Sequence, residues 1–220
     1  MQITLQSIPL REALHFLGWR GTPLEPELVA QLKAACHRAI GQIQPRVTIR
    51  KFSIEQDGGF ASCAFIPKGE DVREMLEPCR EGILLAATLG AQSERLLLRE
   101  QARGSAEAVM MDAVLSAAIE AVCDQSESEL REEAQRRGMY LTDRFSPGYG
   151  DMPLEQTREI CEILDASKSI GLTVSHSGIM IPRKSVTAVM GVSRTPVPRR
   201  PSGCEGCAMR KTCALSRSKT

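Results

Sequence analysis

The chain has 220 residues, of which 42% are hydrophobic and 25% are charged, and its formal net charge is +1. These proportions are ordinary for a globular protein with one sizeable core, so one main domain is expected. No apolar run reaches the roughly 18 residues that span a bilayer, and Met1–Leu10 lacks the pattern of a signal peptide. A membrane protein is therefore excluded, and a cytoplasmic location is expected.

Two helices are expected first. In residues 10–20, apolar and polar residues alternate at helical spacing, and the helix is expected to end at Gly18. Apolar residues three and four positions apart continue over about 26–43, and Pro26 stands where a helix can begin. Each pattern predicts a helix with one buried face.

A β-hairpin is expected next. Polarity alternates over Val47–Gln56 and again over Phe60–Ile66, and Asp57-Gly58-Gly59 between them suits a turn with positive φ. A short helix over about 69–77 then leads to the apolar run Gly82–Leu89. This run, which Gly90 ends, predicts a buried strand.

A long helix is predicted in the middle of the chain. A Leu-rich helix over 93–102 precedes it, and Ser105–Arg137 then keeps a helical pattern until Gly138. The first half is rich in Ala and Met, so neighbouring backbone can approach it closely. The second half, Glu127–Arg137, is mostly charged and is expected to be solvated. One stripe of this helix holds Val109, Ala113, Ala117, Glu120 or Ala121, and Asp124.

The rest of the chain alternates between strand and helix. A short strand over Met139–Asp143 is expected, then a helix from Pro153 to about Ser167, and then strands over Leu172–Ser177 and Ser185–Ser193. The complete series of elements predicts an α+β fold in which a mixed or antiparallel twisted sheet packs against several helices.

The C-terminal segment differs in composition from the domain expected over residues 1–193. Residues 194–220 are rich in Pro, Arg and Ser and predict an irregular tail. Nucleic-acid-binding surfaces often pair positive charge with aromatic side chains, and this tail has none, so nucleic acid is not an expected partner. Against one acid, Glu205, residues 191–220 hold seven bases: Arg194, Arg199, Arg200, Arg210, Lys211, Arg217 and Lys219.

The eight cysteines form two groups. Clustered thiols in a cytosolic chain indicate a metal or redox role rather than a disulfide, and Cys204, Cys207 and Cys213 are clustered in the tail. Their spacing leaves three possibilities open: an iron–sulfur cluster with one other ligand, zinc completed by a distant residue or water, or free thiols. The others stand singly in patterned segments and are expected to be core residues: Cys36, Cys63, Cys79, Cys123 and Cys161.

The loop Arg144–Gly150 joins a strand to a helix. One proline stiffens it and two glycines leave its backbone uncovered, so a ligand can lie against main-chain groups. Arg144 offers a planar fork for a carboxylate, and Tyr149 offers a ring and a hydroxyl. Turns with Pro and Gly are common, so these residues alone do not distinguish a ligand site from an ordinary turn.

The loop resembles a known element. Arg144-Phe145-Ser146-Pro147-Gly148-Tyr149 is similar to the Arg-x-x-x-Gly-Tyr element of the S-adenosylmethionine site in the activation domain of cobalamin-dependent methionine synthase. Gly171–Pro182 is similar to the family's segment with Leu-Thr-x-Ser and Met-x-Pro, and Ala113–Asp124 to its Ala-rich helix. The resemblance covers about residues 80–193 and places Glu120 on a ligand-contacting glutamate.

The resemblance implies a function. In the family, the domain presents S-adenosylmethionine to a cobalamin in the inactive Co(II) state, and one-electron reduction coupled to methyl transfer restores methylcobalamin. No catalytic side chain is implied, because the cobalt itself takes the methyl group. Arg144, Ser146 and Gly148 would contact the ligand largely through backbone, and Tyr149 and Glu120 through side chains.

This chain departs from the family in two respects. The family's acidic contact near the start of the domain cannot be aligned, and Val186-Thr187 occupies the region of a late aromatic contact. The chain also lacks the Asp-x-His-x-x-Gly cobalt-ligand motif. Cobalamin is therefore expected on a partner, either a methionine synthase without its own reactivation domain or another corrinoid protein, together with an electron donor.

Three hypotheses follow. The first is a reactivation factor of methyltransferase type that acts in trans on partner-bound cobalamin. The second is a non-catalytic adaptor or electron relay for a corrinoid protein that uses the cysteine cluster. The third is an enzyme that uses the same ligand site on a different acceptor. An iron–sulfur cluster in the tail would connect the cysteines to the first hypothesis, because reductive methylation consumes an electron.

Overall fold

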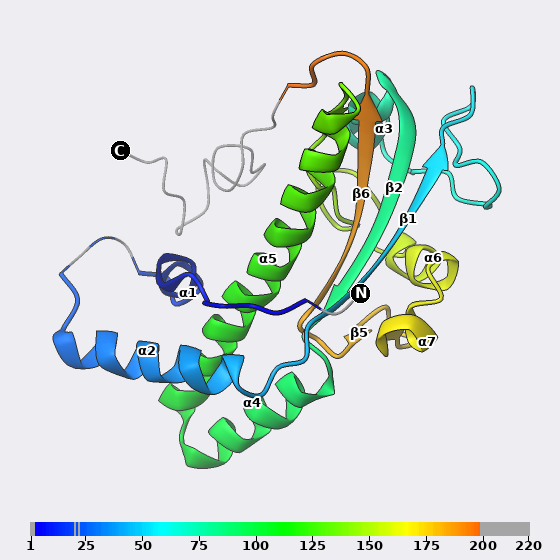
Figure 1. The fold of residues 1–220 in the computed structure, drawn as a ribbon. Coiled ribbons are helices and arrows are strands. Elements are labelled where there is room, and N and C mark those ends of the chain that lie inside the picture. The colour runs from blue at the N-terminus through cyan, green and yellow to red at the C-terminus, as the bar shows by residue number, and fades with distance from the viewer. Residues whose placement is uncertain (1–2, 20, 22, 199–220) are drawn as a thin grey trace.

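The structure is a computed structural model that describes residues 3–19, 21 and 23–198 (Figure 1). The described residues form seven helices: α1 (Leu10–Phe16), α2 (Pro26–Ile40), α3 (Glu70–Leu76), α4 (Ala91–Arg103), α5 (Ser105–Arg136), α6 (Gln156–Ile163) and α7 (Ala166–Ile170). The strands are β1 (Arg46–Ser53), β2 (Cys79–Thr88), β3 (Tyr140–Leu141), β4 (Thr173–Val174), β5 (Met180–Ile181) and β6 (Ser185–Ser193). An α+β fold is therefore confirmed.

The main sheet has the strand order β1-β2-β6-β3, and every neighbouring pair is antiparallel. Strands β4 and β5 form a separate antiparallel pair. Of the two sheet types expected from the sequence, the antiparallel one is present. The predicted tail, including most of its basic residues, lies almost entirely outside the described residues.

Helices cover both faces of the main sheet (Figure 1). Helix α5 packs on one face, and α1, α2 and α4 pack against α5; helices α3, α6 and α7 contact the opposite face. Strand β2 alternates between the two cores, with Ile83 and Leu85 on the α5 side and Leu84 and Ala86 on the other. A strand covered on both faces is apolar throughout, which explains the continuous apolar run in the sequence.

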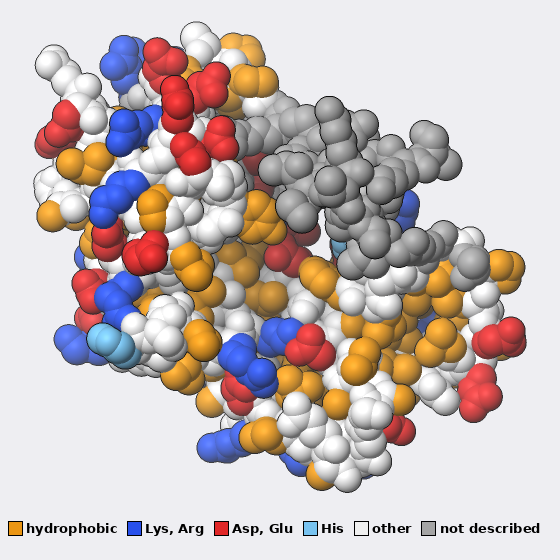
Figure 2. Space-filling model, turned by 180° about the vertical axis from the view of Figure 1, so that it is seen from behind, with side chains coloured by type: hydrophobic (Ala, Val, Ile, Leu, Met, Phe, Trp, Pro, Cys, Tyr) orange, Lys and Arg blue, Asp and Glu red, His pale blue; other side chains and the backbone are white. Residues whose placement is uncertain are grey.

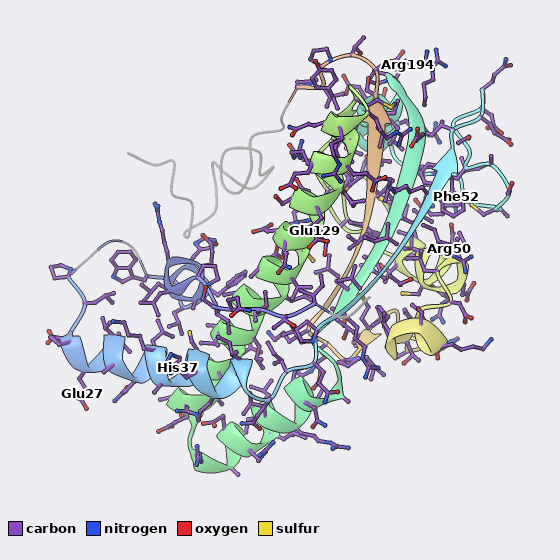
Figure 3. The ribbon with its side chains drawn as sticks, viewed as in Figure 1. Glu27, His37, Arg50, Phe52, Glu129 and Arg194 are labelled. Carbon is purple, nitrogen blue, oxygen red and sulfur yellow. The ribbon has the colours of Figure 1, made fainter. Side chains whose placement is uncertain are left out.

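Aromatic rings fill the core on the α6 side of the sheet. The Phe60 ring centroid lies 5.7 Å from that of Phe52 and 5.3 Å from that of Phe65, and the ring of Phe60 lies directly over Gly82. Phe52 and Arg50 are two residues apart on β1 and lie on the side of α6 (Figure 3). Glycine at position 82 therefore makes room for an aromatic ring against the sheet.

The single cysteines are packing residues, as predicted. Cys36, Cys79, Cys123 and Cys161 are buried, Cys63 is partly buried, and all five are free thiols. Burial raises the pKa of Cys79 to about 11 and that of Cys123 to about 12. These thiols are neutral at physiological pH, so they are poor nucleophiles and poor metal ligands.

The predicted hairpin forms only next to its turn. Glu55 N–H donates to Gly59 C=O, Ile54 bridges Phe60, and Ala61 N–H donates to Ser53 C=O. Strand β2 pairs with β1 along its whole length on the opposite edge, to which Ile54 N–H donates. Beyond Ala61 the returning segment does not continue along β1, because Phe60 and Phe65 are buried in the core beside α6.

Two other segments also differ from expectation. The helix expected from Pro153 to Ser167 is divided into α6 and α7, because Asp165 adopts a left-handed conformation with φ 47°. The charged half of α5 is only partly solvated, since Leu130 and Ala134 are buried. No helix among residues 3–19, 21 and 23–198 has the length and apolar character needed to cross a bilayer.

Replacement of Gly82 by alanine should destabilise the protein. A Cβ at this position would overlap the Phe60 ring, so either the ring or the strand must shift, at a cost of about 1–3 kcal/mol. Gly41→Ala is the control, because its Cβ would meet only ordinary contacts at 3.7 and 3.9 Å. Chemical denaturation measures both variants; equal stability of Gly82→Ala and the wild type would contradict the packing described.

Candidate functional site

The loop after β3 is attached to the free edge of β6. Leu141 pairs with Val192, and Thr142 N–H donates to Gly191 C=O at 2.9 Å. Phe145 then exchanges both of its backbone hydrogen bonds with Val189, at 2.9 and 2.8 Å. The loop thus continues the sheet beyond the two residues of β3.

One extra residue interrupts this pairing. Between the contacts at Thr142 and Phe145, the two loop residues Asp143 and Arg144 lie opposite the single residue Met190. This is the arrangement of a β-bulge, which changes the face on which the following side chains project. In an unbroken register Arg144 would pair with Val189 and enter the apolar core; with the bulge, Phe145 enters that core and Arg144 faces α5.

The residues after the bulge form a tight turn. Ser146 C=O accepts from Tyr149 N–H at 3.1 Å, and Gly148 has φ 89°. Proline at the second position and a positive-φ glycine at the third define a type II turn, which explains why Pro147 and Gly148 occur together. Gly148 is exposed, and the side chain of Tyr149 is 71% exposed.

The bulged edge presents two main-chain groups away from the sheet. Because Phe145 directs its N–H and C=O toward β6, Arg144 C=O and Ser146 N–H point in the opposite direction. Neither group has a hydrogen-bond partner among the described residues. The loop therefore offers one acceptor and one donor, two residues apart, at an open strand edge.

The guanidinium of Arg144 lies among three carboxylates of α5. Its Nη2 is 2.7 Å from Asp124 Oδ1 and 3.3 Å from Glu120 Oε2, and its Nη1 is 3.1 Å from Glu127 Oε2. Nη1 and Glu127 Oε2 are at ion-pair distance, but their geometry is not that of a hydrogen bond. Nη1 is buried and has no aligned hydrogen-bond acceptor among the described residues. Arg144 is only 16% exposed and connects the loop to α5.

A second arginine extends this group. Arg131 Nη1 donates to Leu141 C=O at 2.7 Å, and its Nη2 lies 2.7 Å from Glu127 and 3.3 Å from Asp143. The loop–α5 cluster is defined here as Glu120, Asp124, Glu127, Arg131, Asp143 and Arg144. With four carboxylates and two guanidiniums, the loop–α5 cluster has an excess of two negative charges when all are ionised.

Glu120 is partly buried and lies among other charged side chains. Burial raises the pKa of Glu120 above its usual range; Arg144 opposes this, while Asp124 and Glu12 of α1 add to it. Its side chain remains 44% exposed, so it can still reach a ligand. A half-buried carboxylate with like charges nearby gains from an added cation.

The structure brings together residues that are far apart in the sequence. Glu120 and Arg144 meet at the loop–α5 contact, Ser146 lies in the turn that follows, and Gly148 and Tyr149 are exposed. The sequence analysis missed Glu127 and Arg131 as site residues, although Glu120, Asp124, Glu127 and Arg131 recur at helical spacing on one stripe of α5. The proposed metal ligands Cys204, Cys207 and Cys213 lie outside the described residues.

Two hollows lie along α5 on either side of the cluster. One, of about 200 Å³, is lined by Arg131, Gln135, Tyr140, Leu141 and Val197. The other, of about 270 Å³, is lined by Phe16, Leu97, Gln101, Ala108, Val109, Asp112, Ala113 and Arg183.

Seen from behind, the molecule is hollowed near its centre, where hydrophobic side chains lie at the bottom with acidic side chains beside them (Figure 2). Neither of the two hollows along α5 is lined by the Arg144–Tyr149 loop or by Glu120.

Comparison with known proteins identifies the fold. No protein-family model and no curated protein matches the sequence. Among solved structures, the MetH reactivation domain bound to AdoHcy matches with a TM-score of 0.65 and 16% identity, over 90% of this chain and 79% of that chain. The chain has the fold of that reactivation domain. The reactivation-domain fold agrees with the family resemblance of the loop, although the sequences are far apart.

Replacement of Arg144 by methionine should destabilise the reactivation-domain fold at neutral pH, because the carboxylates of α5 lose their counter-charge. The loss should be about 1–2 kcal/mol, between the values for exposed and buried pairs. Arg144 lowers the pKa of Glu120, so its removal raises that pKa further. A carboxyl group whose pKa is raised in the folded state destabilises the fold while it is ionised, and this penalty disappears when the group is protonated. The difference from wild type should therefore shrink as pH falls from 7 toward 4.

Denaturant titrations at several pH values test this expectation. Arg137→Met is the control, because Arg137 forms an exposed pair with Glu81 away from the loop. A loss in Arg144→Met that stays constant across this pH range would mean that repulsion among the carboxylates is not its cause.

Proposed function

We propose that this protein binds S-adenosylmethionine at the Arg144–Tyr149 loop and supports reductive methylation of cobalamin carried by a partner protein. The observation that carries the proposal is the meeting of Arg144 and Glu120, 24 residues apart, at the loop of a reactivation-domain fold. The matched domain has AdoHcy bound, which is the demethylated form of the proposed ligand.

The strand edge of the loop suits an adenine ring. Adenine presents an amino donor at N6 beside an acceptor at N1, and it can pair with a backbone acceptor and donor as a neighbouring strand would. Arg144 C=O and Ser146 N–H supply these two groups on the side away from β6. In this arrangement Gly148 leaves the backbone of the turn uncovered and Tyr149 lies at the rim, where its exposed ring can contact the ligand.

The charge of the loop–α5 cluster suits a sulfonium. S-adenosylmethionine carries a positive sulfur in addition to its amino and carboxylate groups, and the cluster has two more carboxylates than guanidiniums. A positive charge next to Glu120 would relieve the repulsion that its acidic neighbours exert. Glu120 therefore contributes to the site through its side chain.

In this proposal a partner protein carries the methyl acceptor; residues 1–220 contain no Asp-x-His-x-x-Gly motif. Cobalamin, when presented by the partner, supplies the cobalt that takes the methyl group, and an external donor supplies one electron. The chain's own residues bind and orient the methyl donor on an open surface that a partner can approach. Among residues 3–19, 21 and 23–198 no group of three or more metal-ligating side chains occurs, and the cysteines proposed as ligands lie outside these residues.

Calorimetry with S-adenosylmethionine tests the ligand. We expect the wild type to bind, and Ser146→Pro to weaken binding roughly five- to tenfold, because proline removes one backbone donor worth about 1–1.5 kcal/mol. Ser146→Ala is the matched control, since it keeps the backbone N–H and should bind like the wild type. Thermal unfolding of both variants checks that the loop remains folded.

Either of two results would refute the site. The first is a wild-type protein that does not bind S-adenosylmethionine at all. The second is equal binding by Ser146→Pro and Ser146→Ala in folded proteins, which would place the ligand away from this strand edge.

Absorbance spectroscopy tests the reaction. A methionine synthase truncated before its own reactivation domain and holding Co(II) cobalamin is mixed with this protein, a reductant and S-adenosylmethionine. We expect the methylcobalamin spectrum only when all components are present, and slower formation with Ser146→Pro. Ligand binding without methylcobalamin formation would indicate an enzyme with a different methyl acceptor, and no ligand binding would favour the adaptor or electron-relay hypothesis.

A further inference from the structure

The two sides of the Arg144 guanidinium have different surroundings. On the inner side, Nη1 lies beside Glu127, whose side chain is only 18% exposed and is held by Arg131 at 2.7 Å. On the outer side, Nη2 contacts Asp124 at 2.7 Å, and the Asp124 side chain is 70% exposed. The inner contact is therefore fixed by a further ion pair, whereas the outer contact is made by a side chain surrounded largely by water.

Asp124 can leave Arg144 at little cost. Its side chain accepts a hydrogen bond from Arg144 Nη2 at 2.7 Å. Exposed ion pairs are worth about 0.2–1 kcal/mol, because water replaces the lost contact. Rotation of this short side chain into solvent would leave the outer side of the guanidinium open, with Glu127 still in place on the inner side.

We propose that Asp124 occupies, in the ligand-free protein, the position on Arg144 that the carboxylate of the bound ligand takes. This inference rests on the proposed function. Asp124 presents a carboxylate to the outer side of a loop arginine, as the amino-acid part of S-adenosylmethionine would. Ligand binding then exchanges one carboxylate for another, so Asp124 lowers the affinity for ligands that carry a carboxylate.

Glu120 has a different part in this exchange. Its contact with Arg144 is longer, 3.3 Å against 2.7 Å, and its side chain is less exposed than that of Asp124. When Asp124 moves away, Glu120 remains beside the guanidinium and next to the bound ligand. The carboxylate that leaves and the carboxylate that faces the sulfonium are thus two different residues on the same stripe of α5.

The test compares two ligands and two variants. Adenosine lacks the whole amino-acid part of S-adenosylmethionine, so the ratio of their dissociation constants limits any effect to that part. Its other two groups, the sulfonium and the amino group, are cations, so only the carboxylate can gain from the loss of an acid. Asp124→Ala removes the competitor, and Glu129→Ala is the matched control. Glu129 is an exposed acid on α5, labelled in Figure 3, and it accepts a hydrogen bond from Gln125. Both variants remove one negative charge from the same helix.

Calorimetry should show that Asp124→Ala binds S-adenosylmethionine about two- to fivefold more tightly than the wild type, with adenosine binding unchanged. Glu129→Ala should not tighten binding of either ligand. Loss of a negative charge by itself weakens the binding of a cation, so a gain confined to Asp124→Ala and to the ligand with a carboxylate identifies the exchange.

The inference is overturned if Asp124→Ala binds S-adenosylmethionine with equal or lower affinity, since Asp124 would then be a bystander or a partner of the ligand's amino group. A wild type that binds neither ligand would instead refute the proposed function. The two failures are distinguishable, because the first occurs in a wild type that binds both S-adenosylmethionine and adenosine.

Discussion

The bulge at Asp143 and Arg144 is the constraint on which the site depends. One extra residue opposite Met190 directs Phe145 into the core beside α6 and Arg144 toward the carboxylates of α5. The loop is thereby held on one side by apolar packing and on the other by charge. Its outward backbone groups keep their direction because the bonds between Phe145 and Val189 leave them no freedom to turn inward.

The charges of α5 are arranged by the same constraint. Carboxylates at positions 120, 124 and 127 on one helix would repel one another without a counter-ion, and the bulge supplies Arg144 at their centre. Arg131 connects this group back to β3 through Leu141 C=O, so that helix, strand and loop share one ionic network. The network has two more carboxylates than guanidiniums, so it would attract a cationic ligand such as the proposed methyl donor.

Local patterns predicted the elements that local forces decide. The long helix over Ser105–Arg137, the buried strand before Gly90 and the Pro-Gly turn all occur, because helical periodicity, apolar runs and turn residues act over a few neighbours. The hairpin expected over Val47–Ile66 forms only next to its turn, for a complementary reason. The path of a returning strand depends on the burial that the whole core achieves, and Phe60 and Phe65 are buried beside α6 instead of continuing along β1.

The sequence alone determined the α+β class, the single-cysteine core positions and the likeness of the Arg144–Tyr149 loop to a reactivation domain, since composition, periodicity and a short motif carry these. Only the tertiary structure decided the strand order, the division between α6 and α7, and the meeting of Arg144 with Glu120, Asp124 and Glu127. The physical reason is that a one-residue bulge reverses the face of every following side chain, and its position depends on a partner strand some 45 residues further along the chain.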